Sequence, residues 1–381
     1  MSATTTIEQK PLYNVLPVGQ EIIFAVSNNT ITGTQTKVKF VAEVHISNDV
    51  QITLASTSKV VGTFKTTPNA EGVGMFDLRN VVENYVKADH EAFNGSEYKT
   101  TSVTADSNKP PIHLVNKFTR QTNSIRHMAI KFSVEYLDQD SSSSTYNQII
   151  TAVGSEAPSD DYQIFNGYLK YTDELKLSNN EFGFDITTFF ANPSGGLGVS
   201  SRRYLTNAPT TQYANSGDYG TLAMLLTNET TWGKFKRMII TYYNHSGSAY
   251  AGVDTVTRNT LNGAVFSWST DIKRHILYFG CFPGNLENWS SNYATAVTGG
   301  LSHYVISADD NSGSGLNQNV LEPITIYVNC PTLKGYEPIR LCWLNQWGAW
   351  DYYTFTMKSK RNISTQGSTY HQLGGTWNES K

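Results

Sequence analysis

Residues 338–355 decide the fold class, and they run Pro-Ile-Arg-Leu-Cys-Trp-Leu-Asn-Gln-Trp-Gly-Ala-Trp-Asp-Tyr-Tyr-Thr-Phe. Apolar residues occupy alternate positions on both sides of a central turn, at Ile339, Leu341, Trp343, Tyr353 and Phe355. A period of two is typical of β-strands, and Gly348 lies between the two runs. The stretch therefore predicts a β-hairpin.

The hairpin is unusually aromatic, because three of the seven tryptophans of the chain fall within a window of eight residues. This much aromatic surface is buried against the protein's own core, a neighbouring subunit or a flat ligand such as a sugar. Leu341, Cys342 and Leu344 flank the tryptophans, whereas a sugar site needs polar groups beside the stacking rings. Core or subunit contact is therefore favoured over ligand stacking.

We expect the aromatic side chains to divide between core and interface, namely Trp343, Trp347, Trp350, Tyr352 and Phe355. Alternation along the strands predicts that Trp343 and Phe355 face inward. Trp347 is expected at the turn, where a partner could cover it.

Composition agrees with an all-β fold over the 381 residues. Charged residues make up only 16% of the chain, against roughly 25% in ordinary soluble proteins. Thr, Ser, Asn, Gly, Tyr and Phe replace them, and these residues favour strands and turns over helices. We predict two or more β-sandwich-like domains with one or two short helices.

The polar segment 154–161 is the predicted domain boundary. Residues 1–158 would form an amino-terminal β-sandwich with one helix at about 77–87, capped by Asp77. Residues 159–381 would form a second sandwich-like domain with the aromatic hairpin and a short helix at 220–226. The predicted strands are 21–27, 37–47, 59–65, 129–137, 146–153, 237–243, 264–269, 274–279, 303–306 and 325–328.

No catalytic, cofactor or metal site is predicted, so the chain is not expected to be an enzyme. The eight histidines are scattered, with no local pair at ligand spacing. Ser194–Gly198 lacks the Lys-Ser or Lys-Thr that follows a phosphate loop, and the acidic pairs at 160–161 and 309–310 are expected to lie in polar loops. The three cysteines, Cys281, Cys330 and Cys342, are expected to be buried free thiols.

Charge and hydropathy limit the partners. The formal net charge of −3 offers no basic field for a nucleic acid backbone. No apolar run approaches the roughly 18–20 residues needed to span a membrane, and the first ten residues show no secretory signal. We expect no nucleic acid partner, no membrane contact and folding in the cytoplasm of the producing cell.

Four segments together resemble virion structural proteins of tailed bacteriophages and prophages. Residues 340–355 are similar to their signature R-L-x-x-L-N-x-x-G-x-W-D-x-Y-x-F. Residues 76–86 resemble their F-D-L-x-x-I-V-x-x-Y helix start, residues 204–209 their F-L-T-N-x-P segment, and residues 282–286 their P-x-G-x-x-N-L turn. The segments occur in the family's order and span most of the chain.

The resemblance implies a virion component without enzymatic activity, in the tail, baseplate or neck. Its partners would be other copies of the chain and neighbouring virion proteins, and it would reach the virion by assembly in the host cytoplasm. Family members often continue past the hairpin, so whether a region follows Lys381 stays open. The alternatives are a carbohydrate- or receptor-binding module of a tail fibre, and a polysaccharide hydrolase, which would need two facing acidic residues.

Overall fold

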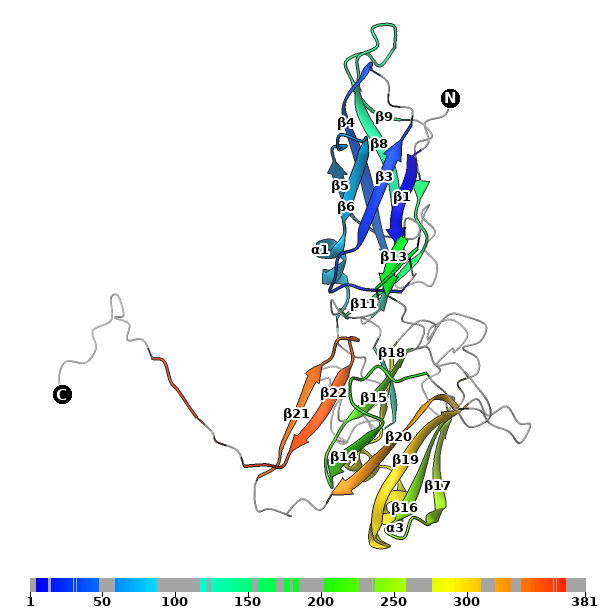
Figure 1. Ribbon diagram of the computed structural model, residues 1–381, viewed down its shortest axis with the longest axis vertical. Coiled ribbons are helices and arrows are strands. Elements are labelled where there is room, and N and C mark those ends of the chain that lie inside the picture. Colours follow the sequence, from blue (N-terminus) through cyan, green and yellow to red (C-terminus); the bar gives the residue numbers. More distant parts are fainter. Residues whose placement is uncertain are drawn as a thin grey trace, which may run out of the picture.

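The computed structural model describes residues 5–12, 15–29, 31, 33–47, 59–87, 117–121, 125–152, 157–168, 175–178, 181–184, 202–225, 235, 237–257, 276–309, 319–329, 337–358, 360 and 362–367. These residues are mostly strand, which confirms the predicted all-β class. They form an upper body, a lower body and a separate hairpin beside the lower body (Figure 1).

The upper body contains two sheets. The first joins, in spatial order, β12 (Leu175–Ser178), β13 (Glu181–Phe184), β1 (Thr5–Pro11), β3 (Ile23–Asn28) and β6 (Val73–Asp77). The second joins β2 (Val15–Pro17), β11 (Tyr162–Phe165), β8 (Ile125–Asp138), β4 (Gln35–Ser47) and β5 (Lys59–Thr66), and β8 also pairs with β9 (Ile149–Thr151) and β10 (Ala157–Pro158).

These two sheets form a sandwich around an aromatic core. The Phe24 ring of β3 lies 5.5 Å from the Phe132 ring of β8 and 5.6 Å from the Tyr162 ring of β11. In β4, Phe40, Ala42, Val44 and Ile46 join one core cluster at alternate positions, as a strand with one face on the core requires. The upper body is therefore sandwich-like, and it takes β11, β12 and β13 from beyond residue 158.

The predicted helix at 77–87 is shorter than expected. It consists of one turn, α1 (Arg79–Val82), followed by the 3₁₀ turn η1 (Glu83–Tyr85), and Val86 is already extended. Asp77 does act at its start, because its Oδ1 accepts hydrogen bonds from the N–H groups of Arg79 at 3.0 Å and Ile22 at 3.1 Å. Asp77 thus ties the turn to the segment before β3, but it is not the predicted N-cap: that position is Leu78, which makes no side-chain cap hydrogen bond.

The lower body contains a five-stranded and a three-stranded sheet. The larger sheet has the order β14 (Thr211–Asn215), β20 (Asn319–Asn329), β19 (Leu301–Asp309), β16 (Arg237–Asn244) and β17 (Ala249–Thr257). The smaller has the order β15 (Thr221–Leu225), β18 (Ile276–Gly280) and β7 (Phe118–Gln121). Leu277 and Phe279 of β18 share one core cluster with Ile240 of β16 and Tyr304 of β19, so the two sheets pack together.

Two short helices follow β18, namely α2 (Pro283–Leu286) and α3 (Ser291–Thr298). The sequence prediction missed α3, whose cap is Ser290: its hydroxyl oxygen accepts a hydrogen bond from the Tyr293 N–H at 2.8 Å. Tyr293 and Ala296 form the buried side of α3, which packs against the core of the lower body. No helix in the described ranges is long and apolar enough to cross a membrane.

The helix predicted at 220–226 is wrong, because residues 221–225 form the strand β15. Leu222 and Met224 face the core of the lower body, while Ala223 and Leu225 face a different cluster. A strand buried on both faces has a continuous apolar run, which sequence periodicity alone does not distinguish from a buried helix. The turn between β16 and β17 contains Gly247, which has a positive φ, and β17 begins directly after it at Ala249.

The other predicted strands overlap observed ones, except 264–269, which lies outside the described residues. Strand pairing crosses the predicted boundary at 158 in both directions. β11 and β13, which follow it, pair with the upper sheets, and β7, which precedes it, pairs with β18 below.

The hairpin consists of β21 (Ile339–Leu344) and β22 (Trp350–Phe355), as the sequence predicts. Its tip belongs to a hydrophobic cluster between the two bodies. There, Trp347 and Ala349 pack with Phe165 from the upper body and Tyr278 from the lower body. The hairpin tip thereby contacts both bodies.

Candidate functional site

The register of the hairpin sorts its side chains onto two faces. Ile339 pairs with Phe355 and Leu341 with Tyr353, so these four side chains share one face. Arg340 pairs with Thr354 and Cys342 with Tyr352, so these four share the other. We call the first group, together with Trp343, the outward face.

Arg340 fixes the opposite face to the lower body. Its Nε donates a hydrogen bond to the backbone oxygen of Tyr219 at 2.8 Å, and its Nη1 donates to Asp218 Oδ2 at 3.2 Å and to Thr354 Oγ1 at 2.7 Å. The guanidinium also lies over the ring of Tyr352, 5.4 Å from the ring centre. Burial lowers the pKa of Arg340, and the charge of Asp218 opposes this effect.

Two neighbouring contacts complete this anchor. The hydroxyl of Thr354 donates to Asp218 Oδ2 at 2.7 Å, so one carboxylate oxygen serves both strands of the hairpin. The Phe282 ring, which belongs to the segment before α2, lies 5.0 Å from the Arg340 guanidinium. A planar guanidinium suits this combination of ion pair and ring stacking better than a lysine does.

The tip of the hairpin is held by Asn345. Its Oδ1 accepts hydrogen bonds from the N–H groups of Trp347 at 2.9 Å and Ala349 at 3.1 Å, and its Nδ2 donates to the oxygen of Leu205 at 2.9 Å. Gly348 has a φ of +70°, and an added Cβ would lie 2.1 Å from the Asn166 oxygen. The turn therefore requires glycine for both its conformation and its close approach to the upper body.

Asp351 ties the second strand to the segment at 204–209. Its carboxylate accepts hydrogen bonds from the Thr206 hydroxyl and from the Asn207 N–H at 3.0 Å. The Asn207 side chain in turn accepts a hydrogen bond from Trp347 Nε1 at 3.0 Å. Three of the four segments that carry the phage resemblance thus meet at this hairpin, and the fourth, at 76–86, lies in the upper body.

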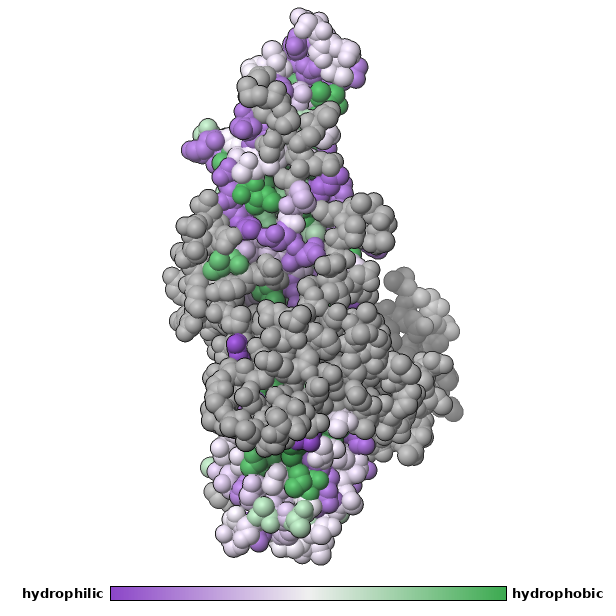
Figure 2. Space-filling model, turned by 90° about the vertical axis from the view of Figure 1, so that its right-hand side faces the viewer, coloured by the Kyte–Doolittle hydropathy of each residue, from purple (hydrophilic) through white to green (hydrophobic). Residues whose placement is uncertain are grey.

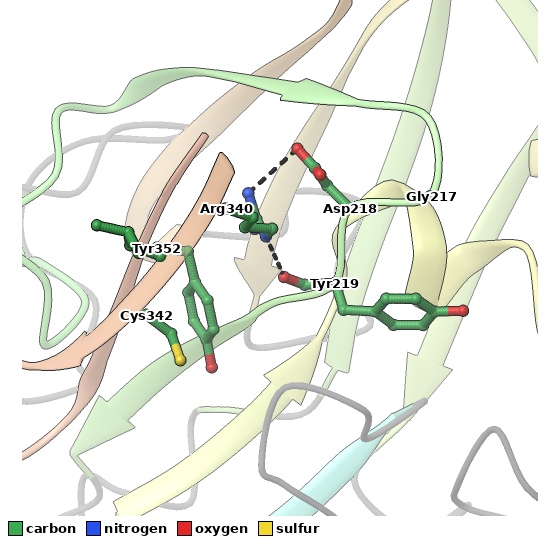
Figure 3. A pocket seen from close by; sticks show the side chains of 7 residues that line it. Gly217, Asp218, Tyr219, Arg340, Cys342 and Tyr352 are labelled. Carbon is green, nitrogen blue, oxygen red and sulfur yellow. Dashed lines mark hydrogen bonds and ion pairs between the residues drawn. The ribbon is translucent and has the colours of Figure 1, made fainter. Parts of the chain in front are cut away.

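A pocket of about 400 Å³ opens beside β21 (Figure 3). The turn before β15 and the two hairpin strands line it, with Gly217, Asp218, Tyr219, Arg340, Leu341, Cys342 and Tyr352. Asp218 and Arg340 are engaged with each other, so the pocket offers mainly apolar surface. It suits an apolar side chain or group better than an anion.

The outward face is exposed over most of its length. Leu341 is 49% exposed, Trp343 41%, Tyr353 56% and Phe355 48%. Four large apolar side chains side by side exceed the isolated exposed residues that are ordinary on soluble proteins. This face is the strongest candidate for a contact surface in the described part of the chain.

The structure overturns the predicted inward direction of Trp343 and Phe355, which are both exposed. The anchors at Arg340 and Tyr352 occupy the body side, and this leaves the alternate residues outside. Trp347 is only 6% exposed and lies in the hydrophobic cluster between the two bodies instead of being open to a partner. Tyr352 is buried, and Trp350 is half-buried against both neighbouring clusters.

The cysteines also differ from the prediction. Cys281 is buried as expected, and burial raises the pKa of its thiol. Cys342 is exposed on β21, and Cys330 lies outside the described residues.

The described residues also contain a buried carboxylate, Asp254, away from the hairpin. Asp254 accepts hydrogen bonds from Tyr242 and Ser290, and its other oxygen accepts one from Asn292 at 2.8 Å. These contacts tie α3 to β16 and β17, and the group includes no imidazole that could activate the serine. In the ranges that the structure describes, no three His, Cys, Asp or Glu side chains are placed to hold a metal ion.

A row of four rings crosses the outer side of the larger lower sheet. Tyr243, His303, Tyr327 and Tyr213 are register partners on four adjacent strands. Ring centres are 4.8 to 5.5 Å apart, and the Tyr243 and His303 rings are nearly parallel. On the face that Figure 2 shows, the lower end is mostly pale, weakly polar surface with some hydrophobic patches, while strongly hydrophilic residues are more frequent on the upper body.

Sequence reasoning missed Asp218 and its pairing with Arg340, since nothing local marks a carboxylate that meets a residue 122 positions away. The segments at 204–209 and 282–286 were noticed only through the family resemblance. Their Asn and Phe residues carry no separate sequence signal for contact with the hairpin.

Comparisons with known proteins identify no family for this chain. No family model and no curated protein matches the chain. Among solved structures, the chain is similar to native Escherichia coli alpha-2-macroglobulin at 7% identity and a TM-score of 0.21, covering 90% of this chain and 18% of that one. It is likewise similar to methylamine-reacted Salmonella alpha-2-macroglobulin at 6% identity and a TM-score of 0.22, covering 90% and 17%. The chain spans less than a fifth of these proteins, and likenesses this distant carry no argument about its function.

Proposed function

We propose that this protein is a structural subunit of a tailed-phage virion, in the tail, baseplate or neck, and that it acts through contacts with other subunits. The observation that carries the proposal is the asymmetry of the hairpin. One face is fixed to the body by Arg340 and Tyr352, and the outward face exposes Leu341, Trp343 and Tyr353. A two-stranded sheet is marginally stable by itself and gains from a layer on each face.

The phage resemblance supports the same proposal from another direction. The segments at 204–209, 282–286 and 340–355 contact one another through Asn345, Asp351 and Arg340. Residues that form one packed unit are expected to recur together, so their joint presence is more specific than any single short match. The weakly polar surface that the lower end shows in Figure 2 also suits burial between subunits.

The mass of the purified chain in solution, together with images of any particles it forms, tests this function. A closed ring or another defined oligomer is the expected result. A stable monomer, at concentrations from micromolar to millimolar, that neither self-associates nor joins other virion proteins would contradict it.

The alternative function, a carbohydrate- or receptor-binding module of a tail fibre, has one observation in its favour. Tyr213 is 62% exposed at the end of the ring row, and a tyrosine face can stack on a sugar. The inner rings, His303 and Tyr327, stack on their neighbours instead of presenting free faces. Binding of the monomeric chain to a glycan array, lost in Tyr213→Ala, would favour this alternative.

A further inference from the structure

Among the residues that the structure describes, β21 has a free strand edge. In the described part of the chain it pairs only with β22, and β22 is the strand that contacts β14 and β15. Figure 1 accordingly shows β21 on the outer side of the hairpin. An unpaired strand edge is a template for another extended segment.

The same chain carries an extended segment without a place to pack. After β22 ends at Phe355, the described residues of 356–367 are all exposed, with Met357 at 65% and Ile363 at 89%. Figure 1 shows this segment, in red, leading away from both bodies. We call residues 356–367 the arm.

The arm begins as a continuation of the outward face. Met357 follows Tyr353 and Phe355 at the same period of two, so the apolar stripe runs from β22 into the arm. At about 3.3 Å per residue, the twelve residues can span roughly 40 Å, well over the length of a six-residue strand. The arm therefore has the pattern and the length of an added strand.

The arm cannot readily reach the free edge of its own β21. Register places Phe355, where the arm starts, opposite Ile339, where β21 starts. To reach the far edge, the arm would have to cross residues 337 and 338, which enter β21 at that point. Connections that cross at one edge of a sheet are avoided in proteins.

The pocket beside β21 supplies a matching recess. Leu341 and Cys342 of β21 form part of its lining, and its volume of about 400 Å³ is ample for one aliphatic side chain. Strand addition commonly combines main-chain pairing with a pocket for an alternate side chain of the incoming segment.

We propose that the arm of one copy adds to the free edge of β21 in a second copy and inserts Met357 or Ile363 into the pocket there. This inference rests on the proposed function, because it names the segment through which subunits would exchange contacts. Exchange of such a segment between identical chains is a common route to oligomers.

Cys342 provides a native probe, because it is exposed on the free edge. In a Cys330→Ser background, the rate at which maleimide alkylates Cys342 is measured together with the mass in solution. The arm variant carries Met357→Asp and Ile363→Asp, and the matched control carries Ser364→Asp and Thr365→Asp in the same arm. Circular dichroism and thermal melting confirm that each variant is folded.

If the arm pairs as proposed, the background chain is oligomeric, its Cys342 reacts about tenfold more slowly than in the arm variant, and the arm variant loses mass. The control retains both properties. A synthetic peptide of residues 356–367 restores protection of Cys342 in the arm variant.

Two results would overturn the inference. If the arm variant keeps the same oligomer and the same alkylation rate, subunits associate through another surface, and the proposed function stands without the arm. If the background chain is monomeric and its Cys342 is unprotected, a second copy is not the occupant. Detection of the chain in purified particles then decides the proposed function separately.

Discussion

The carboxylate of Asp351 accepts a hydrogen bond at 3.0 Å from the N–H of Asn207, a residue 144 positions earlier in the chain. Asp351 is the register partner of Trp343, so this contact marks the end of the outward face that lies nearest the tip of the hairpin. Beyond it, Trp343 and Tyr353 are exposed. The same packing of the hairpin therefore both attaches it to the body and leaves some of its aromatic residues exposed.

Asp351→Ala should destabilise the protein by about 1–3 kcal/mol, because the Thr206 hydroxyl and the Asn207 N–H lose a buried acceptor. Urea unfolding measures the change. Asp160→Ala is the control, since that side chain is 53% exposed in its ion pair with Lys10, and it should cost less than about 0.5 kcal/mol. Equal costs for the two variants would mean that Asp351 does not anchor the hairpin.

Gly348→Ala should be much more costly than Gly217→Ala. Both glycines have positive φ, +70° and +79°, so both variants include a conformational penalty of about 1 kcal/mol. Only at Gly348 would the new Cβ also meet a backbone oxygen, that of Asn166, at 2.1 Å. The difference between their free energies of unfolding reports the contact between hairpin tip and upper body, and no difference would refute that contact.

Arg340→Lys should lower the free energy of unfolding by about 1–2 kcal/mol, although the charge is kept. A lysine cannot bond the Tyr219 oxygen, Asp218 and Thr354 at once while stacking on a ring. Arg79→Lys serves as the comparison, because its side chain is 43% exposed and its pair with Glu83 is 4.0 Å long. A change below about 0.5 kcal/mol is expected there, and the same small change at Arg340 would contradict the anchor.

His303 should make stability fall on mild acidification. Partial burial between rings lowers its pKa below the ordinary value of 6.5, so the unfolded chain binds the proton more readily than the folded one. The contribution of His303 to the free energy of unfolding is thus fully present above pH 6.5. It decreases as the pH falls from 6.5 through the lowered pKa of His303. Unfolding curves across this range test the effect, which His303→Gln should remove. A histidine NMR titration with the pKa at or above 6.5 would contradict it.

Trp347→Ala and Trp343→Ala should separate the two roles of the aromatic hairpin. Trp347 is 6% exposed and donates a hydrogen bond to Asn207, so its loss should cost about 3–5 kcal/mol. Trp343 is 41% exposed, and its truncation should cost much less in an isolated chain. Thermal melting of monomeric samples gives the comparison, and a reversed order would place Trp343 in the core.

The sequence correctly predicted the strands that have a clear local pattern. Its predictions were wrong where contacts between distant segments determine the structure. The period-two run in β4 and the hairpin at β21–β22 were predicted correctly because one face of each is set by alternation. β15 was mistaken for a helix because both of its faces are buried. The direction of Trp343 was mistaken because Arg340, a charged residue, occupies the inward face through its pairing with Asp218. Alternation shows that two faces differ, but not which of them meets the body.

The mass in solution of Trp343→Glu, beside the unaltered chain, tests the subunit role of the outward face most directly. Tyr213→Glu is the control, since it places the same charge on an exposed aromatic site of another sheet, where Tyr213 is 62% exposed against 41% for Trp343. The expected result is a defined oligomer for the unaltered chain and for Tyr213→Glu, and a folded monomer for Trp343→Glu. An oligomer of unchanged mass in Trp343→Glu would contradict the assignment of this face to subunit contact.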